Sequence, residues 1–382
     1  MAEIPPPVTP DRTAPVRFGV VGLGNIGALH CRLLASGAIK RARLAAVCDA
    51  DRARLAPHAD PVRTFDRLED MLSERTINAL LIALPHPAHV PAALAGLRAG
   101  CHVLVEKPLS THVAACAPLL AAGRDPRLVL GVVYNMRTNP AFQAIRSMIR
   151  SGELGRMLRV QWTVTDGFRP DAYYASAPWR GTWAGEGGGV LINQSSHCLD
   201  MLGWLFGRPR RVRAFCAFGR HHAIEVEDDV TAYCEFDGGA TGTFITSNGE
   251  APGTNRLEIA AEGGRLLYED HHLQFLRNAT STTEFARTSV KGFATPAAVE
   301  VPLAVTGPDP QHAGILQNFT DAILDGVPVL APVEEAIGAV ELANAMLLST
   351  WLDRTVDLPL DPQFYAAQLQ ARIDRNAAHA PR

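Results

Sequence analysis

Residues 16–36 read VRFGVVGLGNIGALHCRLLAS, and this stretch decides the fold of the first part of the chain. An apolar run typical of a buried strand leads into a glycine turn, and helix-compatible sequence follows. The spacing G-x-G-x-x-G permits a tight turn, a close backbone approach and close packing of helix on strand. Such a turn places a pyrophosphate at the helix N-terminus. The residues expected to contact it are Gly22, Gly24, Asn25, Ile26 and Gly27.

A second predicted strand, LAAVCD, ends on Asp49, which lies 22 positions beyond Gly27. A carboxylate at this distance from the glycine turn usually binds the adenosine ribose hydroxyls, so Asp49 favours NAD as the cofactor. Arg52 and Arg54 follow closely in the sequence. They either hold the 2′-phosphate of NADP or lie on an exposed helix, and both interpretations stay open.

Two further strand candidates occupy residues 78–85 (NALLIALP) and 101–108 (CHVLVEKP), with helical spacing of apolar residues between them. Alternating strands and helices indicate a parallel, doubly wound sheet, whose ligands bind beyond the carboxyl ends of the strands. The residues expected to contact the cofactor there are Pro85, His86, His89, Glu106 and Lys107. Lys107 precedes Pro108, which keeps its backbone out of the helical region and permits a cis bond that aims the lysine rigidly.

A second domain is predicted beyond about Met136, where β-type sequence begins. Runs such as RMLRVQWTVTDG and DVTAYCEFDGGATGTFITSNG combine strand composition with hairpin turn signals. We predict an α/β chain with a tail at residues 1–15, a Rossmann dinucleotide-binding domain at 16–136, and an α+β substrate domain at 137–382. The second domain should contain a large open, mostly antiparallel sheet. Its bare outer face would be apolar, so we expect a homodimer or homotetramer assembled through it.

The stretch GEGGGVLINQSSHCLD at residues 185–200 supplies the candidate catalytic histidine. Its three consecutive glycines allow backbone to approach a ligand closely. A helix beginning near Ile192 would have one apolar face and one open face. The open face would carry Asn193, His197, Asp200 and Trp204. The spacing alone favours a catalytic and a capping role for His197 equally.

Composition argues for a small-molecule partner. A net charge of −3 provides no positive field for nucleic acid, and no uninterrupted run of about 18 apolar residues predicts a membrane span. The N-terminal tail lacks the apolar core of a secretory signal, so we expect a cytoplasmic protein. Seven cysteines without a C-x-x-C pair argue against disulfides and against a cysteine zinc site. We therefore expect reduced, buried cysteines and no metal.

Five ordered motifs within residues 16–360 resemble the Gfo/Idh/MocA oxidoreductases, NAD(P)-dependent enzymes that act mostly on sugars, cyclitols and their derivatives. The motifs are VVGLGNIGALH, ALPHPAH, VLVEKPLS, YNMRTNP followed by GELG, and GEGGGVLINQSSHCLD. The resemblance implies a Rossmann domain, a substrate domain on an open sheet, and a family lysine and histidine at Lys107 and His197. Asn193 stands where the family commonly has aspartate, and His86 where it usually has asparagine. An amide cannot exchange a proton, so Asn193 is expected to hold a hydroxyl or orient the histidine.

The expected chemistry follows from hydride transfer. Oxidising a secondary alcohol removes a hydride from carbon and a proton from oxygen, which requires a base near the hydroxyl. His197 is the expected base. Lys107, with its pKa lowered by a cationic nicotinamide, is expected to polarise the substrate oxygen and relay the proton. The residues expected to orient the substrate are Arg137, Trp179, Arg180, Asn193 and Asp200.

Two other functions are compatible with these residues. The first is a glycosidase of the same fold that keeps NAD bound, oxidises the sugar transiently, eliminates the aglycone and reduces the sugar again. The second is an NAD-binding regulator without catalysis. Degenerate glycines or a missing lysine would favour the regulator, whereas the glycine turn, Lys107 and His197 are all present.

Overall fold

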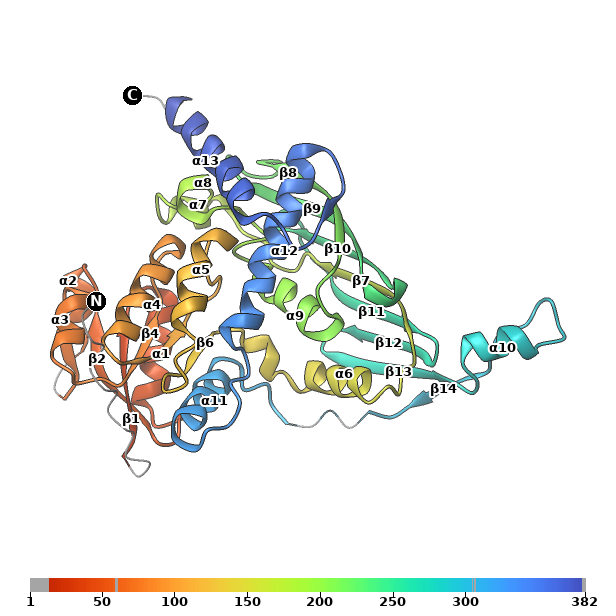
Figure 1. Cartoon of the computed structure of the whole chain (residues 1–382), viewed down its shortest axis with the longest axis horizontal. Coiled ribbons are helices and arrows are strands. Elements are labelled where there is room, and N and C mark those ends of the chain that lie inside the picture. Colours follow the sequence, from red (N-terminus) through yellow and green to blue (C-terminus); the bar gives the residue numbers. More distant parts are fainter. Residues whose placement is uncertain (1–13, 59–60, 304, 306, 380–382) are drawn as a thin grey trace. The chain divides into compact units, whose positions relative to one another are not determined.

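The computed structural model describes residues 14–58, 61–303, 305 and 307–379 (Figure 1). Within them the chain forms two compact units. Unit 1 joins the described residues up to Thr138 to the segment Pro310–Val340, and unit 2 joins Asn139–Asp309 to the described residues from Glu341 onward. Residues 1–13, most of the predicted tail, lie outside the described residues.

Unit 1 is built on a six-stranded parallel sheet in the order β3-β2-β1-β4-β5-β6. Its strands are β1 (Val16–Val21), β2 (Ala42–Cys48), β3 (Arg63–Phe65), β4 (Ala79–Ile82), β5 (His102–Val105) and β6 (Leu130–Val132). Its helices are α1 (Asn25–Ala35), α2 (Arg52–Leu55), α3 (Leu68–Ser73), η1 (His86–Ala88), α4 (His89–Arg98), α5 (Val113–Ala122), η2 (Asn135–Thr138) and α11 (Gln311–Asp325). The strand order confirms the predicted doubly wound parallel sheet.

The core of unit 1 explains why a late segment of the chain belongs to it. β1 is buried at every position except the partly exposed Arg17, as expected of a strand covered on both sides, and Phe18 is fully buried. Phe319 of α11 packs on Phe18 with the ring centroids 6.2 Å apart. The sequence placed residues 310–340 in the second domain, whereas the structure groups them with unit 1. Helical spacing shows that α11 has an apolar face but does not show which sheet that face covers.

Unit 2 is built on a nine-stranded sheet in the order β14-β13-β12-β11-β7-β10-β9-β8-β15. Its strands are β7 (Met157–Val164), β8 (Arg211–Phe218), β9 (Glu227–Glu235), β10 (Thr241–Ser247), β11 (Asn255–Ala261), β12 (Gly264–Glu269), β13 (His272–Asn278), β14 (Ala298–Val301) and β15 (Val356–Asp357). β7 and β10 pair in parallel, and the other described pairs are antiparallel. The predicted mostly antiparallel sheet is confirmed.

One face of this sheet is covered by helices and the other is open. On the covered face Trp162 is buried, and Phe142 of α6 (Pro140–Arg150) lies 5.8 Å from it between ring centroids. On the open face Phe215 and Tyr233 are exposed. The remaining helices are α6 (Pro140–Arg150), α7 (Asp171–Ala175), α8 (Trp183–Glu186), α9 (Ser196–Phe206), η3 (Asp237–Gly239), α10 (Thr282–Thr288), α12 (Val333–Leu352) and α13 (Pro362–His379). None of the described helices combines the length and apolarity that crossing a bilayer requires.

The cysteines behave as apolar core residues. All seven are buried and free of disulfide bonds, as the sequence predicts. Burial raises the pKa of Cys48 to about 12 and that of Cys101 to about 11, so both thiols stay protonated at neutral pH.

Candidate active site

The turn between β1 and α1 is tight at its ends and open in its middle. Gly22 has a φ of +87°, and a Cβ there would lie 2.5 Å from the carbonyl oxygen of Ala83. A Cβ at Gly27 would lie 1.8 Å from the carbonyl oxygen of Gly22. Gly24 has open space beside it, and exposed Asn25 begins the 11-residue helix α1. A turn that excludes side chains and leaves this helix N-terminus approachable fits a pyrophosphate.

Asp49 connects the end of β2 to the glycine turn. Its Oδ2 accepts the backbone N–H of Leu23 at 2.6 Å, and its Oδ1 accepts that of Asp51 at 2.8 Å. Arg54 lies 3.6 Å from Oδ2, whereas Arg52 points to Asp66. The carboxylate is thus fixed beside the turn, where it fits a ribose. Arg52 is engaged with a different carboxylate.

Pro85, His86 and His89 follow β4. Pro85 is exposed, whereas His86 is buried at the start of η1. His89 begins α4; its Nδ1 lies 2.7 Å from the carbonyl oxygen of Pro108 and its Nε2 lies 2.7 Å from that of Leu84. Burial lowers the pKa of His89. Its side chain connects the loops that follow β4 and β5.

Glu106 and Lys107 follow β5, and the Lys107–Pro108 bond is cis, the form that the sequence permits. Glu106 Oε1 lies 2.7 Å from His30 Nε2, and Oε2 accepts the backbone N–H of Lys107 at 3.1 Å. Burial would raise the pKa of Glu106, but the hydrogen bond and charge of His30, with the charges of Lys107 and His312, lower it to about 2. Glu106 is therefore a buried carboxylate at neutral pH. The sequence analysis did not identify His30, which lies 76 positions from its partner.

In unit 2, helix α9 begins at Ser196, so the predicted start near Ile192 is wrong. The preceding turn is closed by two hydrogen bonds, from Asn193 N–H to the Gly189 carbonyl at 2.9 Å and from Ser195 N–H to the Val190 carbonyl at 2.7 Å. Asn193 therefore lies in this turn and not on the helix. His197 is the second residue of α9 and is half-buried.

Asn193 belongs to a network centred on the hydroxyl of Tyr173. Its Nδ2 donates to Tyr173 Oη at 3.0 Å and to Glu186 Oε1 at 2.5 Å. Arg180 also donates to Tyr173 Oη, and its guanidinium lies 4.1 Å above the Tyr173 ring and 4.4 Å from the Trp179 ring. The structure thus brings together the predicted residues Trp179, Arg180 and Asn193. Tyr173 and Glu186 were missed, although the tyrosine pair in DAYYASAPW was a visible signal.

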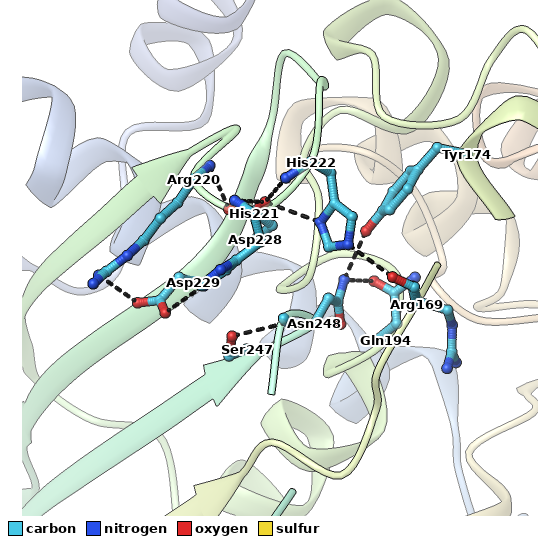
Figure 2. Close-up of polar contacts among 11 residues, drawn as sticks. Arg169, Tyr174, Gln194, Arg220, His221, His222, Asp228, Asp229, Ser247 and Asn248 are labelled. Atoms are coloured by element: carbon cyan, nitrogen blue, oxygen red, sulfur yellow. Dashed lines mark hydrogen bonds and ion pairs between the residues drawn. The ribbon is translucent and has the colours of Figure 1, made fainter. Parts of the chain in front are cut away.

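A second part of this network extends to the sheet (Figure 2). Gln194 donates to Tyr173 Oη at 3.1 Å and accepts from Asn248 Nδ2 at 3.1 Å, and the same Nδ2 donates to Tyr174 Oη at 3.0 Å. His222 lies 3.0 Å from Asp228 and 2.7 Å from the carbonyl oxygen of Arg169. These bonds attach helix α7, which carries both tyrosines, to β9 and to the residue that follows β10.

Glu227 holds the glycine run that precedes Asn193. Its Oε1 accepts the N–H of Gly189 at 2.8 Å and of Leu191 at 3.1 Å. A Cβ at Gly189 would lie 1.9 Å from the Glu227 carbonyl oxygen, so only glycine fits there. Burial raises the pKa of Glu227 to about 7 although the Gly189 and Leu191 N–H groups lower it, and the charge of Glu186 raises it further. Glu227 therefore titrates near neutral pH.

Two predicted substrate residues lie in the interior. Arg137 is fully buried and donates to the Leu330 carbonyl oxygen and to Glu335 within unit 1. These contacts hold the guanidinium against other residues of unit 1. Asp200 and Trp204 are buried as well, and Arg146 of α6 lies 3.9 Å from the Trp204 ring. The predicted open face of α9 is therefore wrong, because α6 packs against it.

Comparison with known proteins agrees with this geometry. Residues 16–134 match an oxidoreductase family with an NAD-binding Rossmann fold, and residues 142–267 match the Gfo/Idh/MocA C-terminal domain. The chain belongs to the Gfo/Idh/MocA family. It is an NAD-binding dehydrogenase that acts on CH–OH groups.

Several relatives and solved structures are similar over most of this Gfo/Idh/MocA chain. Inositol 2-dehydrogenase of Rhizobium meliloti (strain 1021) is 26% identical over 352 residues, which cover 90% of this chain and 99% of the relative. Trans-1,2-dihydrobenzene-1,2-diol dehydrogenase of Mus musculus is 27% identical over 239 residues, 61% of this chain and 68% of the relative. The WlbA dehydrogenase from Bordetella pertussis, solved with NADH and UDP-GlcNAcA, is 28% identical with a TM-score of 0.77, covering 91% of this chain and 100% of that one.

Proposed function

We propose that this protein oxidises a secondary hydroxyl of a sugar, cyclitol or related cyclic polyol with NAD, or reduces the corresponding ketone in the reverse direction. The observation that carries the proposal is the position of Lys107, directly after β5, in a parallel sheet whose β1 leads into the glycine turn. Ligands of such sheets bind at the carboxyl ends of the strands. The names of the relatives, an inositol dehydrogenase and a cyclic diol dehydrogenase, support the substrate class.

The glycine turn and Asp49 would hold the cofactor. Gly24 leaves space for the pyrophosphate, and the Asp49 carboxylate fits the ribose hydroxyls of NAD. Arg52 is paired with Asp66, which supports NAD over NADP. When bound, NAD supplies the hydride acceptor.

The side chains of the protein supply the proton chemistry. His197 accepts the proton of the substrate hydroxyl, since an imidazole titrates near neutral pH. Lys107 donates a hydrogen bond to the same oxygen and stabilises its developing negative charge. Asn193 cannot exchange a proton. With its amide held by Tyr173 and Glu186, it orients the substrate or the histidine.

A substrate panel tests the proposal. The purified protein is mixed with NAD or NADP and with sugars, inositols, cyclic diols and glycosides, and absorbance of the reduced nicotinamide is followed together with product analysis. The expected result is that the absorbance of the reduced nicotinamide increases when a cyclic polyol is added. Glycoside cleavage without net reduced cofactor would instead identify the redox glycosidase. If neither assay detects a reaction with any compound of the panel, the NAD-binding regulator without catalysis would be favoured.

We also propose that the open sheet face of unit 2 assembles copies of the chain. Phe215 and Tyr233 are large side chains exposed on neighbouring strands β8 and β9. Light scattering after gel filtration should give a dimer or tetramer. The double variant Phe215→Arg/Tyr233→Arg should give a smaller species, and an unchanged mass would refute assembly through this face.

A further inference from the structure

The segment formed by Glu106, Lys107 and Pro108 lies between two buried histidines. His30 of α1 contacts Glu106, and His89 of α4 contacts the carbonyl oxygen of Pro108. The exposed fractions are 0% for His30, 1% for His89 and 4% for Glu106. Side chains this deeply buried present no surface to a dinucleotide. The role of these three side chains therefore follows from the protein groups to which they are hydrogen-bonded.

On the N-terminal side of Lys107, the contacts form a chain from helix α1 to the lysine backbone. His30 Nε2 donates to Glu106, and Glu106 in turn accepts the N–H of Lys107. The other nitrogen of His30, Nδ1, is buried and has no hydrogen-bond partner in the described part of the chain. The only described hydrogen bond of the His30 side chain is therefore the one to Glu106.

On the C-terminal side, His89 bridges two loops. Its ring nitrogens lie 2.7 Å from the carbonyl oxygens of Leu84 and Pro108. A neutral imidazole donates to one of these oxygens, and an imidazolium donates to both. In either state the ring restrains the backbone immediately after Lys107 against α4.

We propose that His30 and His89 are positioning residues for Lys107, which restrain the backbone on its two sides so that the ammonium group stays directed at the reacting oxygen. The inference rests on the function proposed for Lys107. It also replaces the cofactor contacts predicted for the side chains of Glu106 and His89 with contacts that support the lysine. Such restraint matters because a lysine side chain is flexible and a misplacement of about 1 Å can cost about 10²-fold in rate.

The scarcity of lysine makes this position directly measurable. The chain contains three lysines, Lys40, Lys107 and Lys291. Lys40 and Lys291 are exposed. In a Lys40→Arg/Lys291→Arg background, ¹³C-lysine labelling therefore gives an NMR signal from Lys107 alone. This signal reports the environment of Lys107 whether or not a substrate is known.

Matched variants separate positioning from general loss of packing. His30→Leu removes the donor to Glu106, and His30→Gln keeps an N–H group that can reach it. His89→Leu removes the bridge after Lys107. His102→Leu is the control: His102 is also buried, on β5 itself, and its Nδ1 accepts the N–H of Val129 at 3.0 Å.

We expect the variants to change the Lys107 signal and the turnover that depends on Lys107, and to leave cofactor binding nearly unchanged. His30→Leu and His89→Leu should shift or broaden the Lys107 signal and lower kcat about 10²-fold on the most active substrate of the panel. NAD affinity should stay within about 3-fold, because the glycine turn is untouched. His30→Gln should recover most of kcat and the signal, and His102→Leu should change neither. If His30→Leu fails to fold, Glu106→Gln tests the same contact.

Three outcomes would overturn the inference. An unchanged Lys107 signal and kcat in both leucine variants would show that the lysine needs no such support. If His102→Leu changes the Lys107 signal and kcat as much as the other leucine variants do, the effect is one of general packing. If NAD affinity falls as much as kcat, the two histidines support cofactor binding and not the position of Lys107. The proposed function fails separately, if Lys107→Ala retains turnover while the Lys107 signal still responds to His30 and His89.

Discussion

Glu106 in unit 1 and Glu227 in unit 2 are both fully buried, yet their pKa values are about 2 and about 7. Each accepts backbone N–H groups from a segment of the candidate site: Glu106 from Lys107, and Glu227 from Gly189 and Leu191. The difference lies in the side-chain partners. Glu106 meets His30, whereas Glu227 has the charge of Glu186 nearby.

The comparison shows what offsets the cost of burying a carboxylate. Backbone amides lower the pKa of Glu227 but not enough to balance its desolvation. At Glu106 the pKa is lowered and not raised, because the imidazole of His30 is in direct contact with the carboxylate and further positive charge lies nearby. Unit 1 thus holds its site segment with a permanent charge. Unit 2 holds the segment from Gly189 to Leu191 with Glu227, a group that can gain or lose a proton near neutral pH.

The largest effect should come from the residue that Glu106 supports. Lys107→Ala should lower kcat about 10³-fold, because it removes the ammonium group from the substrate oxygen. NAD affinity should change by no more than about 3-fold, and Lys40→Ala, at an exposed lysine, should change neither quantity. Steady-state kinetics and a fluorescence titration of NAD measure both. Loss of NAD binding with turnover retained at saturating cofactor would make Lys107 a cofactor residue.

The next effect separates the two glutamates by the sign of their pH dependence. Glu227 has a pKa raised from 4.5 to about 7, so the folded state keeps a proton that the unfolded state releases. Its stabilising contribution is present below pH 4.5 and is lost as pH rises through 7, a change of about 3 kcal/mol in the free energy of unfolding. Urea midpoints at about pH 5 and about pH 8 should show this loss in the wild type and a smaller one in Glu227→Gln.

Glu106 provides the opposite control. Its pKa is lowered from 4.5 to about 2, so its contribution is present above pH 4.5 and is lost as pH falls towards 2. Glu106→Gln should therefore leave the loss between pH 5 and pH 8 as it is in the wild type. Equal pH dependence in the wild type and Glu227→Gln would mean that Glu227 does not titrate in this range.

A smaller effect is expected at Tyr173, on the side of the site that Glu227 holds. Tyr173→Phe removes the oxygen that accepts from Asn193, Gln194 and Arg180. KM should rise about 10-fold with kcat within about 3-fold, because the loss concerns substrate orientation. Tyr268→Phe, at a tyrosine of β12 outside this network, is the matched control. A fall in kcat with KM unchanged would place Tyr173 in the proton chemistry.

The smallest effect should come from an exposed ion pair, which completes the contrast with the buried Glu106–His30 contact. Arg52→Ala breaks the pair with Asp66, and both side chains are solvent-exposed. We expect the Tm to change by less than about 2 °C and the preference for NAD to persist. Thermal melts and kinetics with both cofactors measure this. A large loss of NADP use in the variant would show that Arg52 binds a 2′-phosphate.

Local patterns of sequence predicted the parts of the molecule that local chemistry determines. The glycine turn, the alternation of strands and helices, and the cis bond that a proline permits after Lys107 depend on neighbouring residues, and the structure has each of them. The start of α9 could not be predicted in this way. It depends on Glu227, which lies 38 positions from Gly189 and determines a non-helical turn there.

The supporting contacts of the site were missed for the same reason. His30 and Glu106 lie 76 positions apart, and Asn248 and Gln194 lie 54 apart. Arg137 was predicted to help orient the substrate. Its buried contact with Glu335 joins positions 198 apart, and nothing near either residue indicates that pairing.

The grouping of Pro310–Val340 with unit 1 has a consequence for the order in which the chain can mature during synthesis. The ribosome completes all six strands of the first sheet by Val132, but the helix that covers Phe18 does not exist until residues beyond 310 have been made. Part of the apolar surface of the nascent cofactor domain therefore stays uncovered while β7 to β14, eight of the nine strands of the other unit, are translated. Chaperone contact during that interval should map to the surface around Phe18, and a stop codon after Asp309 should yield a chain that aggregates.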